Sequence, residues 1–239
     1  MNVNRKKTYK RILVIPDLHI PFHHINAFEF IKAVISKYKP DKIVCLGDEQ
    51  DIHSGSFHNH SPDLHSPNDE LEMSLKSFRV LYKIVPECDV LESNHGSLFY
   101  RRAAANSLPK RVIRSYNDII EAPKTWKWHS DLVLYASNGK PIYFCHGQSA
   151  DVLKNSKNKS MNYVQGHHHS KFEIRYWANS LDIYWGVTSG CLIDYKSLAF
   201  EYGRTMLDKP ILGLTLIDEG LPRLIPMVLD KNGRWIKKC

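Results

Sequence analysis

Short apolar runs alternate with amphipathic segments along the first half of the chain. The apolar runs are Arg11–Pro16, Lys42–Leu46 and Asp89–Glu92, and each has the length of a buried strand. The segments between them, Asn26–Tyr38 and Asn68–Val85, repeat apolar side chains every three or four residues, as a helix with one buried face does. The order strand, helix, strand, helix, strand is typical of a parallel sheet with right-handed crossovers.

The second half of the chain favours strands over helices. Leu132–Ala136 and Ile142–Cys145 flank an Asn-Gly pair that predicts a tight hairpin. Further strands are expected at Asn162–Gln165, Phe172–Trp177, Asp182–Thr188, Ile211–Ile217 and Leu224–Leu229. Helices are expected at Tyr100–Asn106, at Lys110–Ile120 and briefly near Ala150, whereas the basic segment Lys154–Lys159 is interpreted as a solvated loop. The pattern predicts an α/β fold with two packed sheets, in which strands of the second half form much of the second sheet.

Length and composition indicate a globular chain with an excess of positive charge. The 239 residues predict a single domain spanning 1–239, with residues 1–10 as a basic N-terminal tail. No apolar run approaches the ~18 residues of a membrane helix, so we expect a cytoplasmic protein without a membrane partner. The net charge of +8 favours an anionic partner, such as a phosphate, a nucleotide or a nucleic acid. The five cysteines form no CxxC pair, which argues against a structural zinc site.

Histidine is enriched, with 13 in the chain, and it is the commonest metal ligand. Several histidines, together with acidic and amide side chains, come just after the predicted strands. These residues are Asp17, His19, Asp48, Asp51, Asn94, His95, His146, His167 and His169. Because the carboxyl ends of strands in an open α/β sheet face the ligand crevice, we expect these side chains to converge.

The residue types suit a pair of divalent cations. Two cations ~3.5–4 Å apart can clamp a phosphoryl group and activate water, and Asp48 is the candidate for the carboxylate that they share. Two cations, two carboxylates and a bridging hydroxide leave a charge of about +1, which attracts a phosphate dianion. A mixed nitrogen and oxygen set without thiolate favours Mn²⁺ first, then Fe, Zn²⁺, Ni²⁺ or Co²⁺, over Ca²⁺ and Mg²⁺.

The motifs also have a familiar order. D-x-H, G-D-x-x-D, N-H, H and G-H-x-H follow one another from Asp17 to His169. This order resembles the calcineurin-like metallophosphoesterase superfamily, of which the chain would be a compact single-domain member. The resemblance implies a two-sheet α/β/β/α sandwich with the active site at the carboxyl ends of the strands. It also implies a phosphoric ester hydrolase in which a metal-bound hydroxide attacks phosphorus.

The resemblance assigns a role to each motif residue. Asp17, His19 and His169 would hold one metal ion. Asn94, His146 and His167 would hold the second, and Asp48 would bridge the two. His95 would be catalytic beside the reacting phosphate, and Asp51 would orient it.

Two positions depart from the superfamily's usual pattern. Gly96 stands where an acidic residue usually follows the catalytic histidine, and Ile52 stands where an arginine often follows G-D-x-x-D. Other residues would then have to bind the substrate phosphate. The candidates are Arg101 and Arg102 in the predicted helix after His95, and His58 and His60 in the histidine-rich segment after Asp51. The alternative is that these are solvated surface side chains.

The substrate is less constrained than the reaction. A compact chain whose site has only loop walls favours a nucleoside 5′-monophosphate phosphatase, that is, a nucleotidase. The alternatives are a nuclease or phosphodiesterase whose basic surface binds DNA or RNA, and a compact Ser/Thr protein phosphatase. A non-catalytic binding module on the same fold is the alternative of a different class. The complete ligand set and the presence of His95 argue against it.

Overall fold

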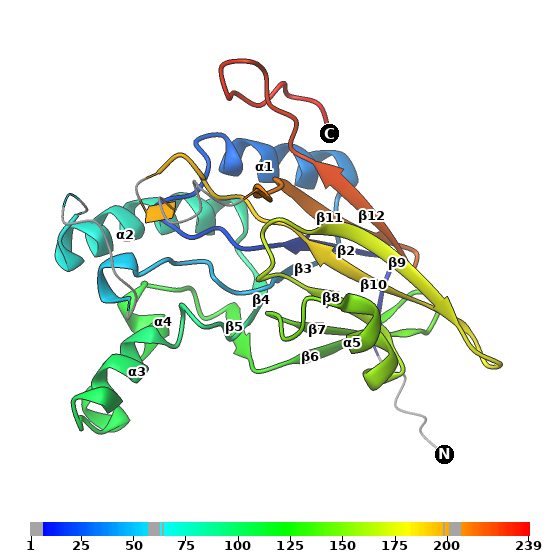
Figure 1. The fold of residues 1–239 in the computed structure, drawn as a ribbon, viewed down its shortest axis with the longest axis horizontal. Helices are drawn as coiled ribbons and strands as arrows, with labels where there is room; N and C mark the ends of the chain where they lie inside the picture. The colour runs from blue at the N-terminus through cyan, green and yellow to red at the C-terminus, as the bar shows by residue number, and fades with distance from the viewer. Residues whose placement is uncertain (1–6, 57–62, 64, 198, 201–206) are drawn as a thin grey trace.

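The computed structural model describes residues 7–56, 63, 65–197, 199–200 and 207–239. Their strands form two six-stranded sheets (Figure 1). The strands of the first sheet are β2 (Arg11–Ile15), β3 (Lys42–Cys45), β4 (Cys88–Leu91), β5 (Trp126–His129), β11 (Gly213–Asp218) and β12 (Leu221–Pro226). Those of the second are β1 (Thr8–Tyr9), β6 (Leu132–Ala136), β7 (Pro141–Cys145), β8 (Asn162–Gln165), β9 (Phe172–Ala178) and β10 (Ile183–Ser189). The orders are β12-β11-β2-β3-β4-β5 and β1-β6-β7-β8-β10-β9.

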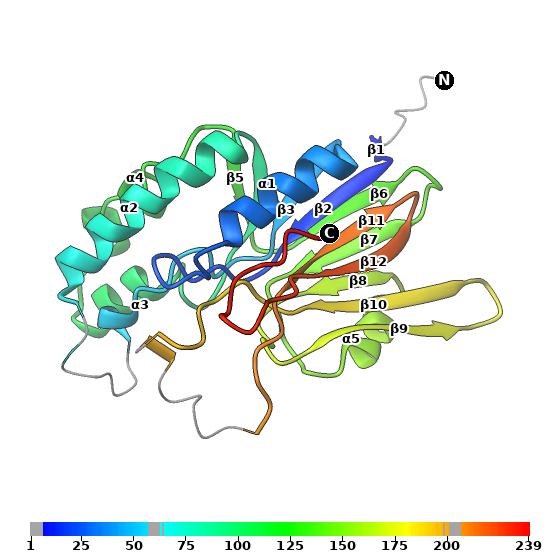
Figure 2. The ribbon, with the colours of Figure 1, turned by 90° about the horizontal axis from the view of Figure 1, so that it is seen from above.

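Helices cover the outer faces of the sheets. The helices are α1 (Ala27–Tyr38), α2 (Pro67–Ile84), α3 (Leu98–Ala105), α4 (Tyr116–Ile119) and α5 (Val152–Lys159), with 3₁₀ turns η1 (His53–Gly55) and η2 (Lys110–Val112). Helices α1 and α2 lie side by side on the first sheet, and α5 lies against the second (Figure 2). The predicted two-sheet α/β/β/α sandwich is confirmed.

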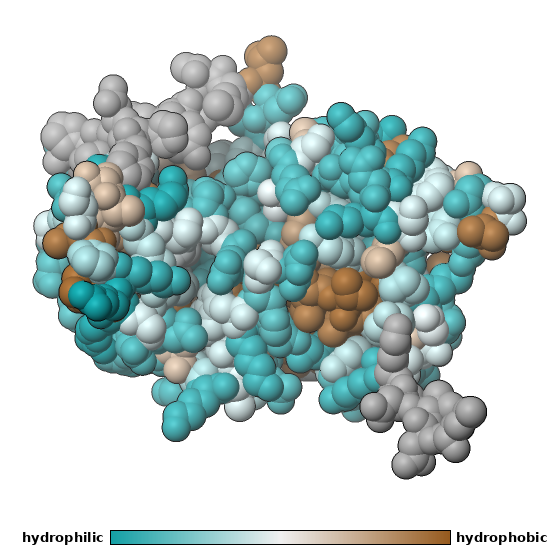
Figure 3. All heavy atoms as spheres, turned by 90° about the horizontal axis from the view of Figure 1, so that it is seen from below, coloured by the Kyte–Doolittle hydropathy of each residue, from teal (hydrophilic) through white to brown (hydrophobic). Residues whose placement is uncertain are grey.

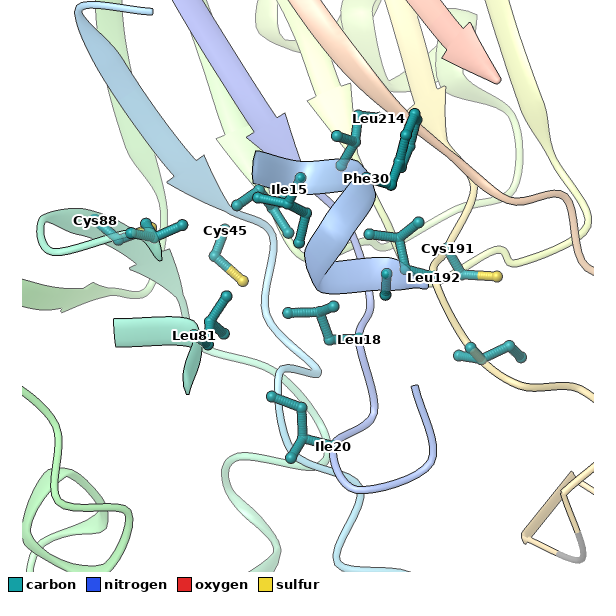
Figure 4. Packing of buried hydrophobic residues seen from close by; sticks show 14 of the residues in the cluster. Ile15, Leu18, Ile20, Phe30, Cys45, Leu81, Cys88, Cys191, Leu192 and Leu214 are labelled. Carbon is teal, nitrogen blue, oxygen red and sulfur yellow. The ribbon is translucent and has the colours of Figure 1, made fainter. Parts of the chain in front are cut away.

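Three apolar clusters hold these layers together. The largest packs α1 and α2 on the first sheet, and its members Leu18 and Ile20 flank His19 in the chain (Figure 4). The second lies between the sheets and includes Phe144, and the third lies under α5. Because Leu18 and Ile20 are at most 1% exposed, burying them fixes the backbone on both sides of His19.

The strand directions bring several carboxyl ends to one edge of the molecule. β2, β3, β4 and β5 are parallel neighbours in the first sheet. β7, β8 and β10 are parallel in the second. The loops that follow these strands therefore gather at the same edge, as the sequence predicts.

Some sequence expectations are wrong. β12 lies three residues earlier than expected, and β5 is not among the expected strands, whereas β6 to β10 form most of the second sheet as predicted. The segment 110–120 forms η2 and α4 rather than one helix. Lys154–Lys159 is helical because Asp151 caps α5 through the Leu153 and Lys154 N–H groups, while Asn155 and Ser156 are buried. Within the predicted tail, β1 pairs with β6, and residues 1–6 lie outside the described residues.

The face of the molecule on the side of α5 and β6 is mostly polar. Figure 3, which looks onto the side of α5 and β6, shows largely hydrophilic residues around one compact hydrophobic patch. Within the described ranges, no helix is both long and apolar enough to cross a membrane.

Asp89 on β4 is expected to stabilise the fold in a pH-dependent way. Its carboxylate accepts from Lys42 Nζ (2.7 Å) and His129 Nε2 (3.0 Å). Burial raises the pKa of Asp89, but these hydrogen bonds outweigh burial and lower the pKa below its ordinary value. The stabilisation is therefore present above the unfolded-state pKa of ~3.9 and is lost as pH falls through the lower folded-state pKa. Asp89→Asn should cost ~1.5–3 kcal/mol of unfolding free energy at pH 7, measured by urea denaturation. A cost that stays constant down to pH 3 would contradict this.

Candidate metal centre

The predicted ligand residues meet at the edge where the strands end. Those from the first sheet's loops are Asp17, His19, Asp48 and Asn94, and those from the second sheet's loops are His146, His167 and His169. Among the described residues, histidine and carboxylate atoms form three groups whose members lie within 4.8 Å of one another. The two sheets thus contribute to a single site.

The first ligand group consists of Asp17, His19 and His169. His169 Nε2 lies 3.1 Å from Asp17 Oδ2 and 3.2 Å from His19 Nε2. Asp17 is fully buried, and its Oδ1 has no hydrogen-bond partner among the described residues. A buried carboxylate oxygen without a donor is costly, so a fully buried Asp17 whose Oδ1 is unpaired and whose Oδ2 faces the His169 imidazole is a carboxylate that a cation would stabilise.

The second ligand group consists of Asp48, His146 and His167, with Asn94 beside it. His146 Nε2 lies 2.8 Å from Asn94 Oδ1 and 3.2 Å from His167 Nδ1. The same nitrogen lies 3.2 Å from Asp48 Oδ2. Nitrogen and neutral oxygen ligands thus converge on one point from three loops.

Asp48 lies between the two groups. Its Oδ2 is 3.2 Å from His146 Nε2 and 3.5 Å from His19 Nε2. Its Oδ1 accepts the backbone N–H of His95 (3.1 Å), which fixes the orientation of the carboxylate. One carboxylate therefore faces ligands of both groups, as a bridging position requires.

Two imidazoles, those of His19 and His146, are oriented by hydrogen bonds at Nδ1, the ring nitrogen that does not face the centre. His19 Nδ1 donates to Asp51 Oδ1 (2.6 Å), and His146 Nδ1 donates to the Leu46 carbonyl (2.8 Å). When Nδ1 carries the proton, Nε2 presents its lone pair to the centre, which is the usual arrangement for a metal-ligating histidine. The donor set of imidazole, carboxylate and amide oxygen fits divalent transition-metal ions.

Asp51 has a wider role than the sequence indicates. It is predicted to orient His95, but its carboxylate lies closer to His19 Nδ1 (2.6 Å) than to His95 Nδ1 (3.3 Å). His95 Nδ1 instead donates to the Asp51 backbone carbonyl. Asp51 thus orients both histidines, one mainly by its side chain and the other mainly by its main chain.

The charges of the site favour a cation. Burial opposes protonation of His146, but the carboxylates of Asp48 and Asp17 outweigh burial and raise its pKa to about 9. Burial also opposes ionisation of Asp48, yet His146 holds the pKa of Asp48 well below its usual value. For His19 burial prevails and lowers the pKa. Without a cation, the centre at neutral pH therefore holds ionised carboxylates, a neutral His19 and a protonated His146, and a bound cation would take the place of the His146 Nε2 proton.

Backbone conformation at the ligands is unusual. His19, Asp48 and His167 have φ values of 49°, 47° and 66°, in the left-handed region that few residues other than glycine adopt. Such conformations persist only where the surroundings impose them, and they cluster at functional sites. Here the sharp turns aim the ligands back over the ends of the strands.

Gly166→Ala is expected to disturb the first ligand group. A Cβ at Gly166 would overlap Asp17 Oδ1 and come within 3.3 Å of Leu46 Cβ. We expect Mn²⁺ affinity, measured by titration calorimetry, to fall ~10–100-fold. The control is Gly139→Ala in the β6–β7 turn, where a Cβ meets no atom within 4 Å. Because Gly139 has a φ of 80°, this control should lower stability and leave Mn²⁺ affinity unchanged.

The two arginines predicted to bind the substrate phosphate donate to backbone carbonyls in this structure. Arg101 donates to the Asn94 carbonyl (2.7 Å), and Arg102 Nε donates to the Gly55 carbonyl (2.5 Å). Arg102 thereby ties α3 to η1. A phosphate role for either arginine stays a prediction. His58 and His60 lie outside the described residues.

Phe200 is a neighbour of the site that sequence reasoning missed. Its ring packs edge-on against His19, with ring centroids 5.5 Å apart, and it is 5% exposed. It comes from the segment between β10 and β11, and nothing in the local pattern marks it. Only the path of the chain across the ends of the strands brings it there.

Comparison with known proteins finds distant structural likeness only. No protein-family model and no curated protein matches the sequence. Among solved structures, the chain is similar to Vps29 of Chaetomium thermophilum (16% identity, 95% of this chain and 93% of that chain, TM-score 0.49). It is similar also to YfcE, a phosphoesterase from E. coli (12%, 95% and 96%, 0.49). A third is TT1561 of Thermus thermophilus (11%, 92% and 99%, 0.40).

The chain forms two six-stranded sheets packed with helices, the α/β/β/α arrangement that the sequence predicts. Candidate metal-binding histidine and aspartate groups lie at the edge of this sandwich where the parallel strands end. The fold and the centre are thus in the relation that the sequence resemblance implies.

Proposed function

We propose that the protein, as one domain spanning 1–239, is a two-metal phosphoesterase. The observation that carries this proposal is the Asp48 carboxylate, whose Oδ2 faces His19 at 3.5 Å and His146 at 3.2 Å. A carboxylate between two ligand groups suits a pair of cations that clamp one phosphoryl group.

Each ligand group would hold one of the two cations. Asp17, His19 and His169 would hold one, and Asn94, His146 and His167 would hold the other, with Asp48 shared. Mn²⁺ is the first candidate, followed by Fe, Zn²⁺, Ni²⁺ or Co²⁺. When bound, the cations would supply positive charge to the phosphate oxygens and an acidified water as nucleophile.

His95 would act on the reacting phosphate. Burial disfavours its charge, but the carboxylates of Asp48 and Asp51 outweigh burial and raise its pKa above the ordinary value. The His95 ring lies 4.7 Å from that of His19, so it is adjacent to the first ligand group. Since Nδ1 donates to the Asp51 carbonyl, Nε2 is free to donate its proton to the leaving oxygen.

The substrate that we propose is a nucleoside 5′-monophosphate. The site is walled by loops of one compact chain, which suits a small phosphomonoester. The second candidate is a nuclease or phosphodiesterase acting on DNA or RNA, which the net charge of +8 favours.

A substrate panel tests these alternatives. Purified protein supplemented with Mn²⁺ is assayed on nucleoside 5′-monophosphates, a bis-aryl phosphate, a phosphopeptide, and single-stranded and duplex DNA. We expect release of inorganic phosphate from the monophosphates. Turnover only of polymers, falling steeply with salt, would replace the nucleotidase by the nuclease. Binding of Mn²⁺ without any turnover would favour a non-catalytic module, and absence of metal binding would overturn the proposal.

A further inference from the structure

Two buried side-chain amides hold the loop that carries His146. This loop, residues 146–151, connects β7 to α5. Gln165 at the end of β8 donates from Nε2 to the Ser149 carbonyl (3.0 Å), and Asn155 on α5 donates from Nδ2 to the same carbonyl (3.0 Å). Asn155 Nδ2 also lies 2.9 Å from Gln165 Oε1, which accepts from it. We call the Gln165 and Asn155 side chains with the Ser149 carbonyl the amide clamp.

The amide clamp is buried and occupies a position where packing alone would not select an amide. Gln165 is 0% exposed and Asn155 is 6% exposed. Tyr163, two residues earlier on the same face of β8, packs in the apolar cluster under α5 with Val152. An apolar side chain at 165 could extend that cluster without the cost of desolvating an amide. The Gln165 amide is instead bonded to the loop, to α5 and, at 3.5 Å, to the Thr188 hydroxyl on β10.

The amide clamp connects the two segments that carry the ligands of the second group. Ser149 lies three residues after His146, and Gln165 lies two residues before His167. The Gly166 N–H also donates to the His146 carbonyl (2.7 Å). The distance between His146 and His167 therefore depends on how the loop is held against the end of β8.

The first ligand group is joined to the second by a bond from the His167 N–H to Asp17 Oδ2 (2.9 Å), but it is also held by bonds of its own. The His169 carbonyl accepts the Ile211 N–H (2.9 Å), and the Asp17 carbonyl accepts the Leu192 N–H (2.8 Å). His19 is held by Asp51. Loss of the amide clamp would therefore affect one ligand group more than the other.

We infer that Gln165 and Asn155 are positioning residues that set the spacing of His146 and His167 and thereby the affinity of the second cation. This inference rests on the proposed two-metal function. It assigns to two amides that are not themselves ligands a specific effect on one of the two metal ions.

The test compares Mn²⁺ titrations of the wild type, Gln165→Leu and a matched control. We expect the wild type to bind two ions and Gln165→Leu to bind one with wild-type affinity and the other ~10–100-fold more weakly. The control is Asn162→Leu, at the other end of β8. Asn162 is 1% exposed, and its Oδ1 accepts the Trp185 N–H (3.1 Å). This control removes an equally buried amide from the same strand, so it should lower the melting temperature but leave both ions bound.

Asn155→Leu is the second variant, in case Gln165→Leu does not fold. It leaves Gln165 in place and should weaken the same ion to a smaller extent. Equal weakening by Asn162→Leu, or two tightly bound ions in folded Gln165→Leu or Asn155→Leu, would overturn the inference. A wild type that binds no Mn²⁺ would instead overturn the two-metal proposal itself, so the two failures are distinguishable.

Discussion

Asp48→Asn is expected to lower the proposed phosphoesterase activity severely and to weaken binding of the metal ions at both ligand groups. The amide keeps the size of the side chain, and asparagine tolerates the left-handed backbone of position 48 better than most residues do. The variant therefore removes the shared negative charge with little change in shape. A loss of about 4 kcal/mol of charge stabilisation corresponds to a fall of ~10³-fold in kcat/KM. The measurements are steady-state kinetics and metal content of the purified variant.

Asp89→Asn is the matched control for Asp48→Asn. Asp89 is 8% exposed and, like Asp48, accepts from basic side chains, but its partners Lys42 and His129 lie outside the ligand groups. The control should lose stability while keeping two bound ions and wild-type kcat/KM. Full activity and full metal content in Asp48→Asn would show that this carboxylate does not bridge.

His95→Ala is expected to lower kcat by ~10²–10⁴-fold with both metal ions retained. Within the described residues, His95 shares a potential ligand group with His19 and Asp48, but its assigned role is proton donation to the leaving oxygen. Removing a positioned general acid slows the chemical step and leaves the cations with their own ligands. Substrates with good leaving groups need less protonation, so an aryl phosphate should lose less rate than a nucleoside monophosphate.

His129→Ala serves as the control for His95→Ala. His129 also contacts a buried carboxylate, that of Asp89 (3.0 Å), but it ends β5 and belongs to none of the ligand groups found among the described residues. Its removal should change stability and not kcat. Wild-type turnover by His95→Ala would remove this histidine from the mechanism, and loss of a metal ion from that variant would make it a ligand instead.

The sequence alone predicted which side chains would lie together, because the relevant signals are local. A buried parallel strand is a short apolar run, and the polar residues that follow it must lie at the carboxyl end of the sheet. Asp17, Asp48 and His146 could be assigned to one crevice on that basis. The Asn-Gly hairpin was also predictable, because the positive φ of Gly139 is a requirement of the turn itself.

Sheet membership could not be predicted in the same way. β5, β11 and β12 are short strands whose residues are compatible with either sheet. Which sheet each strand joins depends on which sheet edge is unpaired where the second half of the chain reaches it. β5 pairs with β4, and β11 pairs with β2, so both edges of the first sheet are extended by the second half of the chain. Such long-range pairing depends on packing of the whole chain rather than on any local pattern.

The ligand types, their order and the strand ends that carry them were thus determined by the sequence, because each follows from residues that are close in the chain. Only the tertiary structure decided which atoms support the ligands: the Asp51 carboxylate at His19, the Phe200 ring beside it, and the Gln165 amide on the Ser149 carbonyl. These contacts join segments that are distant in sequence, and a hydrogen bond or ring contact depends on positions in space that only the packed sheets and helices define.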